Sequence, residues 1–202
     1  MMGGGGHARV LLELLAAAGI PAPMAILDSD PQMSGDVQGI PVLGDDALLG
    51  EVEAETFVLG VGKVDVSPLR QNLFEKAKGH GLRPLTLVHP EALVSPSAVL
   101  GSGSQVLMGA VIGTGSQLGE NVLVNTGAIV DHDCRIGAHT HVATGARLAG
   151  GVHVGEGTLV GLGAVVREGR QIGKGVLIAA GAVVVEDIPD HSRFAGVPAR
   201  PM

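Results

Sequence analysis

The most regular pattern in the chain is an aliphatic residue at every sixth position. From Val88 to Val184, each sixth residue is Val, Leu or Ile. The fourth residue after each of these is small in most repeats, as at Ala110, Ala128 and Cys134, and the residue directly after is often Gly. A helix repeats its apolar residues every three or four positions and a half-buried strand every two, so neither explains this period. The period is typical of a hexapeptide parallel β-helix, in which three short strands complete one triangular coil around stacked aliphatic side chains.

The first 84 residues follow a different pattern, in which expected helices and strands alternate. The glycine loop GGGGH opens onto an apolar-periodic helix that ends at Gly19, and the short strand MAILDSD follows. The strand TFVLGVG and a helix over about 67–79 come later. This alternation predicts a small α/β domain of Rossmann-like type. A glycine loop of this kind normally follows a strand, and only Met1 and Met2 precede it, so the first strand is either shortened or lies upstream of the given start.

Three parts are therefore expected along the chain. Residues 1–84 form the α/β domain and residues 85–186 the β-helix. Residues 187–202 leave the six-residue frame and are expected to fold over the last coil as a cap.

Composition narrows the class of protein. Hydrophobic residues make up 46% of the chain and aromatic residues 1%, which agrees with a narrow aliphatic interior. The net charge of −7 argues against binding to nucleic acid. A single cysteine, Cys134, and the lack of a secretory leader indicate a cytoplasmic protein. Residues 92–119 carry no charge, but polar residues, Gly and Pro interrupt them every few positions, so no membrane insertion is expected.

A histidine between two aspartates interrupts the apolar stretch VNTGAIVDHDCRIG. Because Val130 occupies the inward position, Asp131, His132 and Asp133 are expected at the following turn, outside the core. A single histidine there is most often a solvated turn residue. The surroundings favour a functional site, because Asn125, His139 and His141 lie within ten residues and Gly150 follows eighteen residues later, one coil above if a coil takes three repeats.

Three segments together carry a family resemblance. The string VNTGAIVDHDCRIGAHTHVATGARLAGGVHVG, with GGGGHARV near the start and AGVPARPM at the end, closely resembles the bacterial sugar acetyltransferases grouped with the sialic acid O-acetyltransferase and the UDP-4-amino-sugar N-acetyltransferase. The resemblance spans nearly the whole chain. It implies a left-handed β-helix, acetyl-CoA as co-substrate and a cyclic homotrimer with CoA between neighbouring subunits.

The resemblance also implies roles for individual residues. It makes His132 the general base and Asp133 the acid that orients it, although family members often carry Glu at that position. Asn125 would line the acceptor pocket and His141 would contact acetyl-CoA. The other acetyl-CoA-binding residues implied are Gly150, whose amide would face the thioester oxygen, and Leu162 and Ala180, which would line the pantetheine and nucleotide channel.

The expected chemistry requires residues of these types. An acceptor amine or hydroxyl must lose a proton as it attacks the thioester, and a histidine base typically contributes ~10² to 10⁴ in rate. A peptide N–H at a glycine can approach the developing oxyanion closely. Cys134 is a poor nucleophile candidate, because its position in the repeat points it into the coil.

The glycine loop is the second candidate site. Many glycine turns bind nothing, so the loop alone is a weak signal. By the resemblance, Gly5, Gly6 and His7 would hold the diphosphate and sugar of a nucleotide-linked sugar, Asp28 would contact the base, and Gly62 would lie beside them. Backbone amides at the start of a helix suit a pyrophosphate.

Alternatives remain for both the histidines and the reaction. Hexapeptide-repeat carbonic anhydrases bind zinc through two histidines five apart and a third about two coils earlier, whereas the gaps from His132 to His139, His141 and His153 are 7, 9 and 21, so no metal is expected. The primary hypothesis is N-acetylation of the C4 amine of a nucleotide-linked amino-deoxy sugar. O-acetylation of sialic acid or a related hydroxyl and a non-catalytic nucleotide-sugar-binding scaffold are the alternatives.

Overall fold

The computed structural model describes residues 1–202, whose contacts divide the chain into two compact units. The first unit is Met1–Gly62 with Pro68–Leu85, and the second is Lys63–Ser67 with Thr86–Met202. The short segment Lys63–Ser67 therefore belongs to the second unit, although the residues on both sides of it belong to the first.

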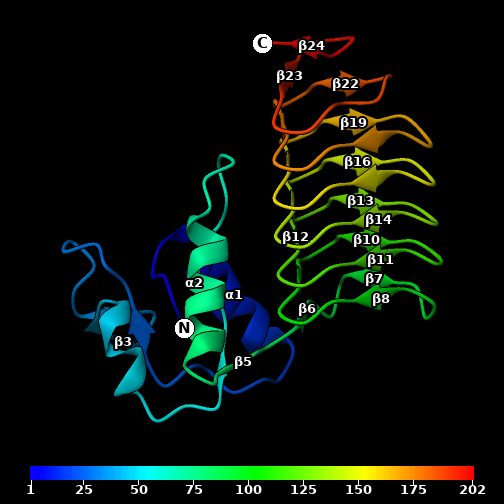
Figure 1. Ribbon diagram of the computed structural model, residues 1–202. Coiled ribbons are helices and arrows are strands. Elements are labelled where there is room, and N and C mark those ends of the chain that lie inside the picture. The colour runs from blue at the N-terminus through cyan, green and yellow to red at the C-terminus, as the bar shows by residue number, and fades with distance from the viewer. The chain divides into compact units, whose positions relative to one another are not determined.

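The second unit is a parallel β-helix wound from two-residue strands (Figure 1). Up to the strand Val165–Val166, each strand pairs in parallel with the strand eighteen residues further on, as in Val124↔Val142 and Val142↔Val160. The strands form three sheets of six, five and eight members, and the last of these includes two strands of the tail. The strands before the tail are β6 (Leu87–Val88), β7 (Leu93–Val94), β8 (Val99–Leu100), β9 (Gln105–Val106), β10 (Val111–Ile112), β11 (Gln117–Leu118), β12 (Leu123–Val124), β13 (Ile129–Val130), β14 (Arg135–Ile136), β15 (His141–Val142), β16 (Arg147–Leu148), β17 (His153–Val154), β18 (Leu159–Val160), β19 (Val165–Val166), β20 (Gln171–Ile172), β21 (Leu177–Ile178) and β22 (Val183–Val184). The β-helix expected from the six-residue period is confirmed.

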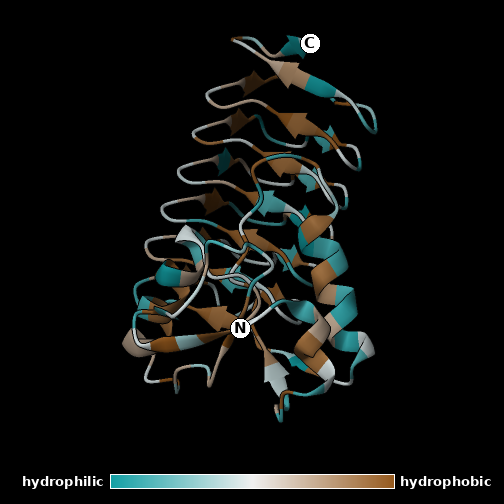
Figure 2. Ribbon diagram, turned by 90° about the vertical axis from the view of Figure 1, so that its left-hand side faces the viewer, coloured by the Kyte–Doolittle hydropathy of each residue, from teal (hydrophilic) through white to brown (hydrophobic).

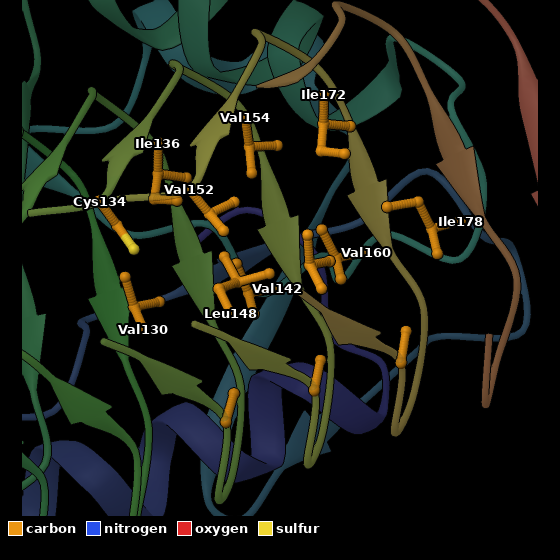
Figure 3. Packing of buried hydrophobic residues seen from close by; sticks show 14 of the residues in the cluster. Val130, Cys134, Ile136, Val142, Leu148, Val152, Val154, Val160, Ile172 and Ile178 are labelled. Carbon is orange, nitrogen blue, oxygen red and sulfur yellow. The ribbon is translucent and has the colours of Figure 1, made fainter. Parts of the chain in front are cut away.

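The core of this unit is a column of aliphatic side chains. Val130, Leu148 and Val166 occupy equivalent positions on successive coils, and each is at most 1% exposed. Figure 3 shows Val130, Leu148 and other inward side chains of this cluster together with the small residue Cys134. In the β-helix, hydrophobic segments (brown) recur from coil to coil, with hydrophilic segments (teal) between them (Figure 2). The near absence of aromatic residues follows from this narrow interior, which Val, Leu, Ile and Ala fill.

The corners between strands require a left-handed backbone at one residue. Between 103 and 181 that residue is glycine at most corners, for example Gly127 with φ +64° and Gly145 with φ +66°. Glycine adopts this conformation without the clash that a Cβ causes. Asn121 (φ 55°), Asp133 (φ 57°) and His139 (φ 58°) stand there instead. A non-glycine residue in this region costs free energy and therefore calls for a compensating role.

The tail extends one sheet of the β-helix. Ile188 forms a parallel bridge with Ile172. Strand β23 (Arg193–Ala195) pairs in parallel with β21, and β24 (Arg200–Pro201) returns antiparallel to β23. The tail thus continues the hydrogen bonding of the last coil.

The first unit contains two α-helices, α1 (Gly6–Ala17) and α2 (Leu69–Gly79), and the 3-10 helix η1 (Asp46–Gly50). Its strands are short, and they are β1 (Ile26–Leu27), β2 (Asp36–Val37), β3 (Ile40–Gly44), β4 (Thr56–Phe57) and β5 (Arg83–Pro84). Strand β1 pairs in parallel with β3, and β4 pairs in parallel with β5. With so few helices and such short strands, the Rossmann-like assignment is not confirmed.

Met1 and Met2 lie where a strand is expected before the glycine loop. Met2 forms parallel bridges to Leu27 and Leu59, and its N–H donates to Val58 O at 3.0 Å. The chain then passes directly into the glycine loop and α1, whose first residue is Gly6.

No helix of the structure has the length and apolar character needed to cross a membrane.

Candidate active site

The D-H-D triplet lies at the corner after β13. Val130 is fully buried, so Asp131, His132 and Asp133 turn outward, and all three are exposed. The His132 N–H donates to Asp131 Oδ1 at 2.7 Å, and the imidazole Nδ1 lies 3.0 Å from Asp133 Oδ2. The polar triplet is therefore placed on an edge of the β-helix, as the repeat predicts.

These contacts set the tautomer and the basicity of His132. A carboxylate accepts hydrogen bonds, so Nδ1 carries the proton and Nε2 keeps the lone pair. The hydrogen bond to Asp133, and then the negative charge of Asp131, raise the pKa of His132 above its ordinary value. An exposed Nε2 with a lone pair is the form that a general base requires.

Gly150 lies directly beside the His132 ring. A Cβ built on Gly150 would overlap Nε2 and Cε1 of His132 and would stand 3.0 Å from Cδ2. The next residue, Gly151, donates its N–H to His132 O at 2.8 Å. The structure thus brings together His132, Asp133 and Gly150, and glycine is the residue that leaves room for the ring.

Asn125 and His141 form a second group. His141 Nδ1 lies 2.8 Å from Lys63 O. Because a carbonyl oxygen can only accept a hydrogen bond, Nδ1 is the protonated nitrogen. Nε2 therefore accepts from Asn125 Nδ2 at 3.2 Å. His141 is 5% exposed. The imidazole is held on both sides in one neutral tautomer.

The two groups lie on different edges of the β-helix. The corner of Asn125 precedes β13, whereas the corner of His132 follows it. Leu162 and Ala180 are exposed and belong to the Asn125 edge, because they follow β18 and β21, which stack above β12 in one sheet. Within one protomer the structure does not bring His132 together with Asn125, His141, Leu162 or Ala180.

The glycine loop and its expected partners lie together in the first unit. Asp28 Oδ2 accepts from the N–H of Gly4 at 2.6 Å, and Asp28 Oδ1 accepts from Asp30 N at 2.8 Å. Gly5 is the N-cap of α1, Gly6 is its first residue, and the first turn has no acidic side chain. A Cβ on Gly62 would lie 3.8 Å from His7 Cβ, so Gly62 faces the start of the helix.

Cys134 lies inside the coil, as its position in the repeat predicts. It is fully buried, and its Sγ donates to Ala149 O at 3.3 Å. Burial raises the pKa of the Cys134 thiol, which keeps it protonated and unreactive.

One residue that contacts this site was missed by the sequence analysis. Lys63 supplies the carbonyl that accepts from His141, although the two are 78 positions apart in the chain. No local motif marks Lys63, so nothing in the periodicity pointed to it.

Comparisons with known proteins agree with this fold. The PglD N-terminal domain family matches residues 1–77. The acetyltransferase domain of PglB from Neisseria gonorrhoeae FA1090 is 41% identical with a TM-score of 0.91, and the match covers 100% of this chain and 97% of that one. PerB from Caulobacter crescentus, solved with CoA and GDP-perosamine, is 44% identical with a TM-score of 0.92, over 100% of this chain and 95% of that one. WeeI from Acinetobacter baumannii AYE shares the fold at 22% identity, with a TM-score of 0.88 over 100% and 97% of the two chains. No curated protein matches the chain.

The β-helix with a histidine on its edge, together with these matches, defines an acyltransferase of the left-handed hexapeptide-repeat class. The chain belongs to the family of bacterial sugar acetyltransferases that includes PglB and PerB, as its sequence motifs indicate.

Proposed function

We propose that the protein transfers the acetyl group of acetyl-CoA directly to the C4 amine of a nucleotide-linked amino-deoxy sugar, with His132 as general base. The observation that carries this proposal is the His132 imidazole, whose Nδ1–H is held by Asp133 and whose Nε2 lies beside Gly150. The relatives support the substrate class, because PerB was solved with CoA and GDP-perosamine and the PglB domain with acetyl coenzyme A.

The reaction follows from this arrangement. The amine attacks the thioester carbonyl, a C–N bond forms, and Nε2 of His132 takes the proton that the nitrogen loses. Asp133 stabilises the imidazolium that results. The N–H of Gly150 is the proposed donor to the oxyanion of the tetrahedral intermediate. When the intermediate collapses, the C–S bond breaks, and the thiolate of CoA recovers the proton from the imidazolium, which regenerates the base.

The acetyl-CoA site is proposed to lie between protomers of a homotrimer. The outward side chains of one sheet form an apolar stripe between the His132 edge and the Asn125 edge. The stripe includes Leu93 (69% exposed) and Val165 (36% exposed), and Arg147 interrupts it. Exposed apolar patches of this kind mark interaction surfaces, and a threefold closed ring would cover this one. In such a ring the His132 edge of one protomer would meet the Asn125 edge of its neighbour, with His141, Leu162 and Ala180 along the CoA channel.

The first unit is proposed to hold the nucleotide sugar as a Rossmann-like α/β domain. Gly5, Gly6 and His7 stand at the N-terminus of α1, where backbone N–H groups and the helix dipole favour a diphosphate. Asp28 fastens the same loop through Gly4 and would contact the base, and Gly62 lies next to His7.

Thiol release from acetyl-CoA across UDP-, GDP- and dTDP-linked 4-amino sugars and sialic acid tests the proposal. We expect release with one amino sugar and a fall of ~10² to 10⁴ in the folded His132→Ala variant. Release with sialic acid alone would identify an O-acetyltransferase. Binding of a nucleotide sugar without any thiol release by the wild-type protein would identify a scaffold.

A further inference from the structure

Between residues 103 and 181, two of the three non-glycine residues at left-handed corners have no part in the proposed chemistry. Asp133 holds His132, which accounts for its presence at such a position. Asn121 and His139 occupy equivalent positions on two successive coils, and both are buried. Their side chains meet, because Asn121 Nδ2 donates to His139 Nδ1 at 2.9 Å. The two side chains therefore form a buried hydrogen-bonded pair at positions where most other corners have glycine.

Lys63 completes this buried polar group. Its side chain is buried, and Nζ donates to the carbonyl oxygens of Gly157 and, at 3.4 Å, of His139. A buried ammonium must have such partners, since it has left its hydration shell. Lys63, Asn121, His139 and Gly157 are called the Lys63 anchor below.

The Lys63 anchor fixes the position of one carbonyl group. Lys63 O accepts from His141 Nδ1 at 2.8 Å, while Nζ of the same residue holds the corner carbonyls. His141 Nε2 then accepts from Asn125 Nδ2, and Asn125 Oδ1 accepts from Thr126 N at 2.8 Å, which sets the amide orientation. Hydrogen bonds therefore lead from the Lys63 carbonyl through His141 to the side chain of Asn125, while the ammonium of the same residue is bound to the corner carbonyls.

We propose that Lys63 is a positioning residue. Its buried ammonium binds the corner carbonyls and so fixes the Lys63 backbone, whose carbonyl holds His141. Through His141, Asn125 is also held in the geometry that the acetyl-transfer site needs. This inference rests on the proposed function for the roles of His141 and Asn125.

Lys63→Met tests this proposal, because methionine keeps an unbranched apolar stem and removes the charge. Lys174→Met is the matched control, since Lys174 is an exposed lysine at a corner of the same β-helix. Nitrogen-15 NMR of the histidine rings reports which nitrogen carries the proton, and His132 serves as internal reference. We expect His141 to lose its single Nδ1–H tautomer in Lys63→Met, with His132 unchanged. We also expect KM for acetyl-CoA, which His141 is proposed to contact, to rise roughly tenfold, the equivalent of one lost hydrogen bond, with kcat changed less. Lys63→Arg keeps the positive charge, so it should restore the tautomer and bring KM back toward the wild-type value.

The outcomes separate this proposal from the proposed function. A folded Lys63→Met protein in which His141 keeps its Nδ1–H tautomer would overturn the positioning role, whatever the activity. If Lys63→Met does not fold, Lys63→Gln allows the same comparison, and an unchanged tautomer there would also overturn it. If the wild-type protein transfers no acetyl group, the proposed function fails, while the tautomer of His141 still decides the role of Lys63.

Discussion

The His132 ring and the backbone of Gly150 are in such close contact that no side chain fits between them. The two residues come from successive coils, eighteen positions apart, and Gly151 N–H binds His132 O across the same step at 2.8 Å. The stacking of coils therefore places Nε2 of His132 next to the peptide group of Gly150.

Gly150→Ala is expected to reduce activity without unfolding the protein. The backbone of Gly150 is outside the left-handed region, so alanine is allowed there, but its Cβ would displace the His132 ring. A displacement of about 1 Å at a catalytic group can cost ~10² in rate, so kcat should fall by about that factor. The double variant with His132→Ala should be no slower than His132→Ala alone, because both changes remove the same group. Additive losses in kcat would contradict the account.

Asp133→Gly is expected to separate activity from stability. Asp133 has a left-handed φ of 57° and is exposed, so replacing it by glycine removes the steric strain of a Cβ at that corner. The melting temperature should stay the same or rise, while kcat falls roughly 10- to 1,000-fold because His132 loses the acid that orients it. Thermal denaturation measures the change in melting temperature, and steady-state kinetics on the same sample measure the change in kcat. Full activity in this variant would show that Asp133 does not orient the base.

The pH dependence should follow the raised pKa of His132. Transfer needs the neutral ring, so kcat/KM should be low below that pKa and rise as the pH increases through it. Asp131→Asn removes a negative charge that raises the pKa, so the acid limb should move to lower pH. The plateau should change little, since an amide oxygen can still accept from the His132 N–H. A shift of the limb toward higher pH would contradict this assignment.

Cys134→Ala is expected to keep activity within about twofold and to lower the stability by about 1 kcal/mol. The thiol is buried in the aliphatic column and donates to Ala149 O, so it contributes packing and one weak hydrogen bond. Kinetics together with chemical denaturation measure both effects. Loss of turnover with an unchanged fold would point to covalent catalysis by Cys134.

Asp28→Ala is expected to affect the nucleotide sugar and not acetyl-CoA. The carboxylate accepts a hydrogen bond from Gly4 N–H and so stabilises the glycine loop. Its loss should therefore raise KM for the nucleotide sugar roughly tenfold. Asp36→Ala is the matched control, because Asp36 also accepts a backbone N–H, from Gly39 at 2.8 Å, in an exposed turn of the same unit. An equal rise in KM for acetyl-CoA would argue against a separate nucleotide site.

The sequence predicts the β-helix and the His132 corner because both depend on local register. Each repeat fixes which side chain points inward, so the place of Asp131, His132 and Asp133 outside the core follows from Val130 inside it. The exceptional corners are also visible in the sequence, where Asn121, Asp133 and His139 interrupt a series of glycines spaced six residues apart. The first unit is harder to predict, because its two-residue strands owe their existence to distant pairing, as between Met2 and Leu59. Lys63 could not be predicted for the same reason, since it binds Gly157 across 94 positions.

The most direct test of proton removal from the acceptor amine by Nε2 of His132 is a crystal structure with CoA and the nucleotide-linked amino sugar bound. We expect the sugar nitrogen within about 2.6–3.2 Å of Nε2, with Asn125 and His141 of a neighbouring protomer beside the CoA. An acceptor nitrogen bound far from His132, or a His132 ring facing solvent with no protomer next to it, would contradict the account.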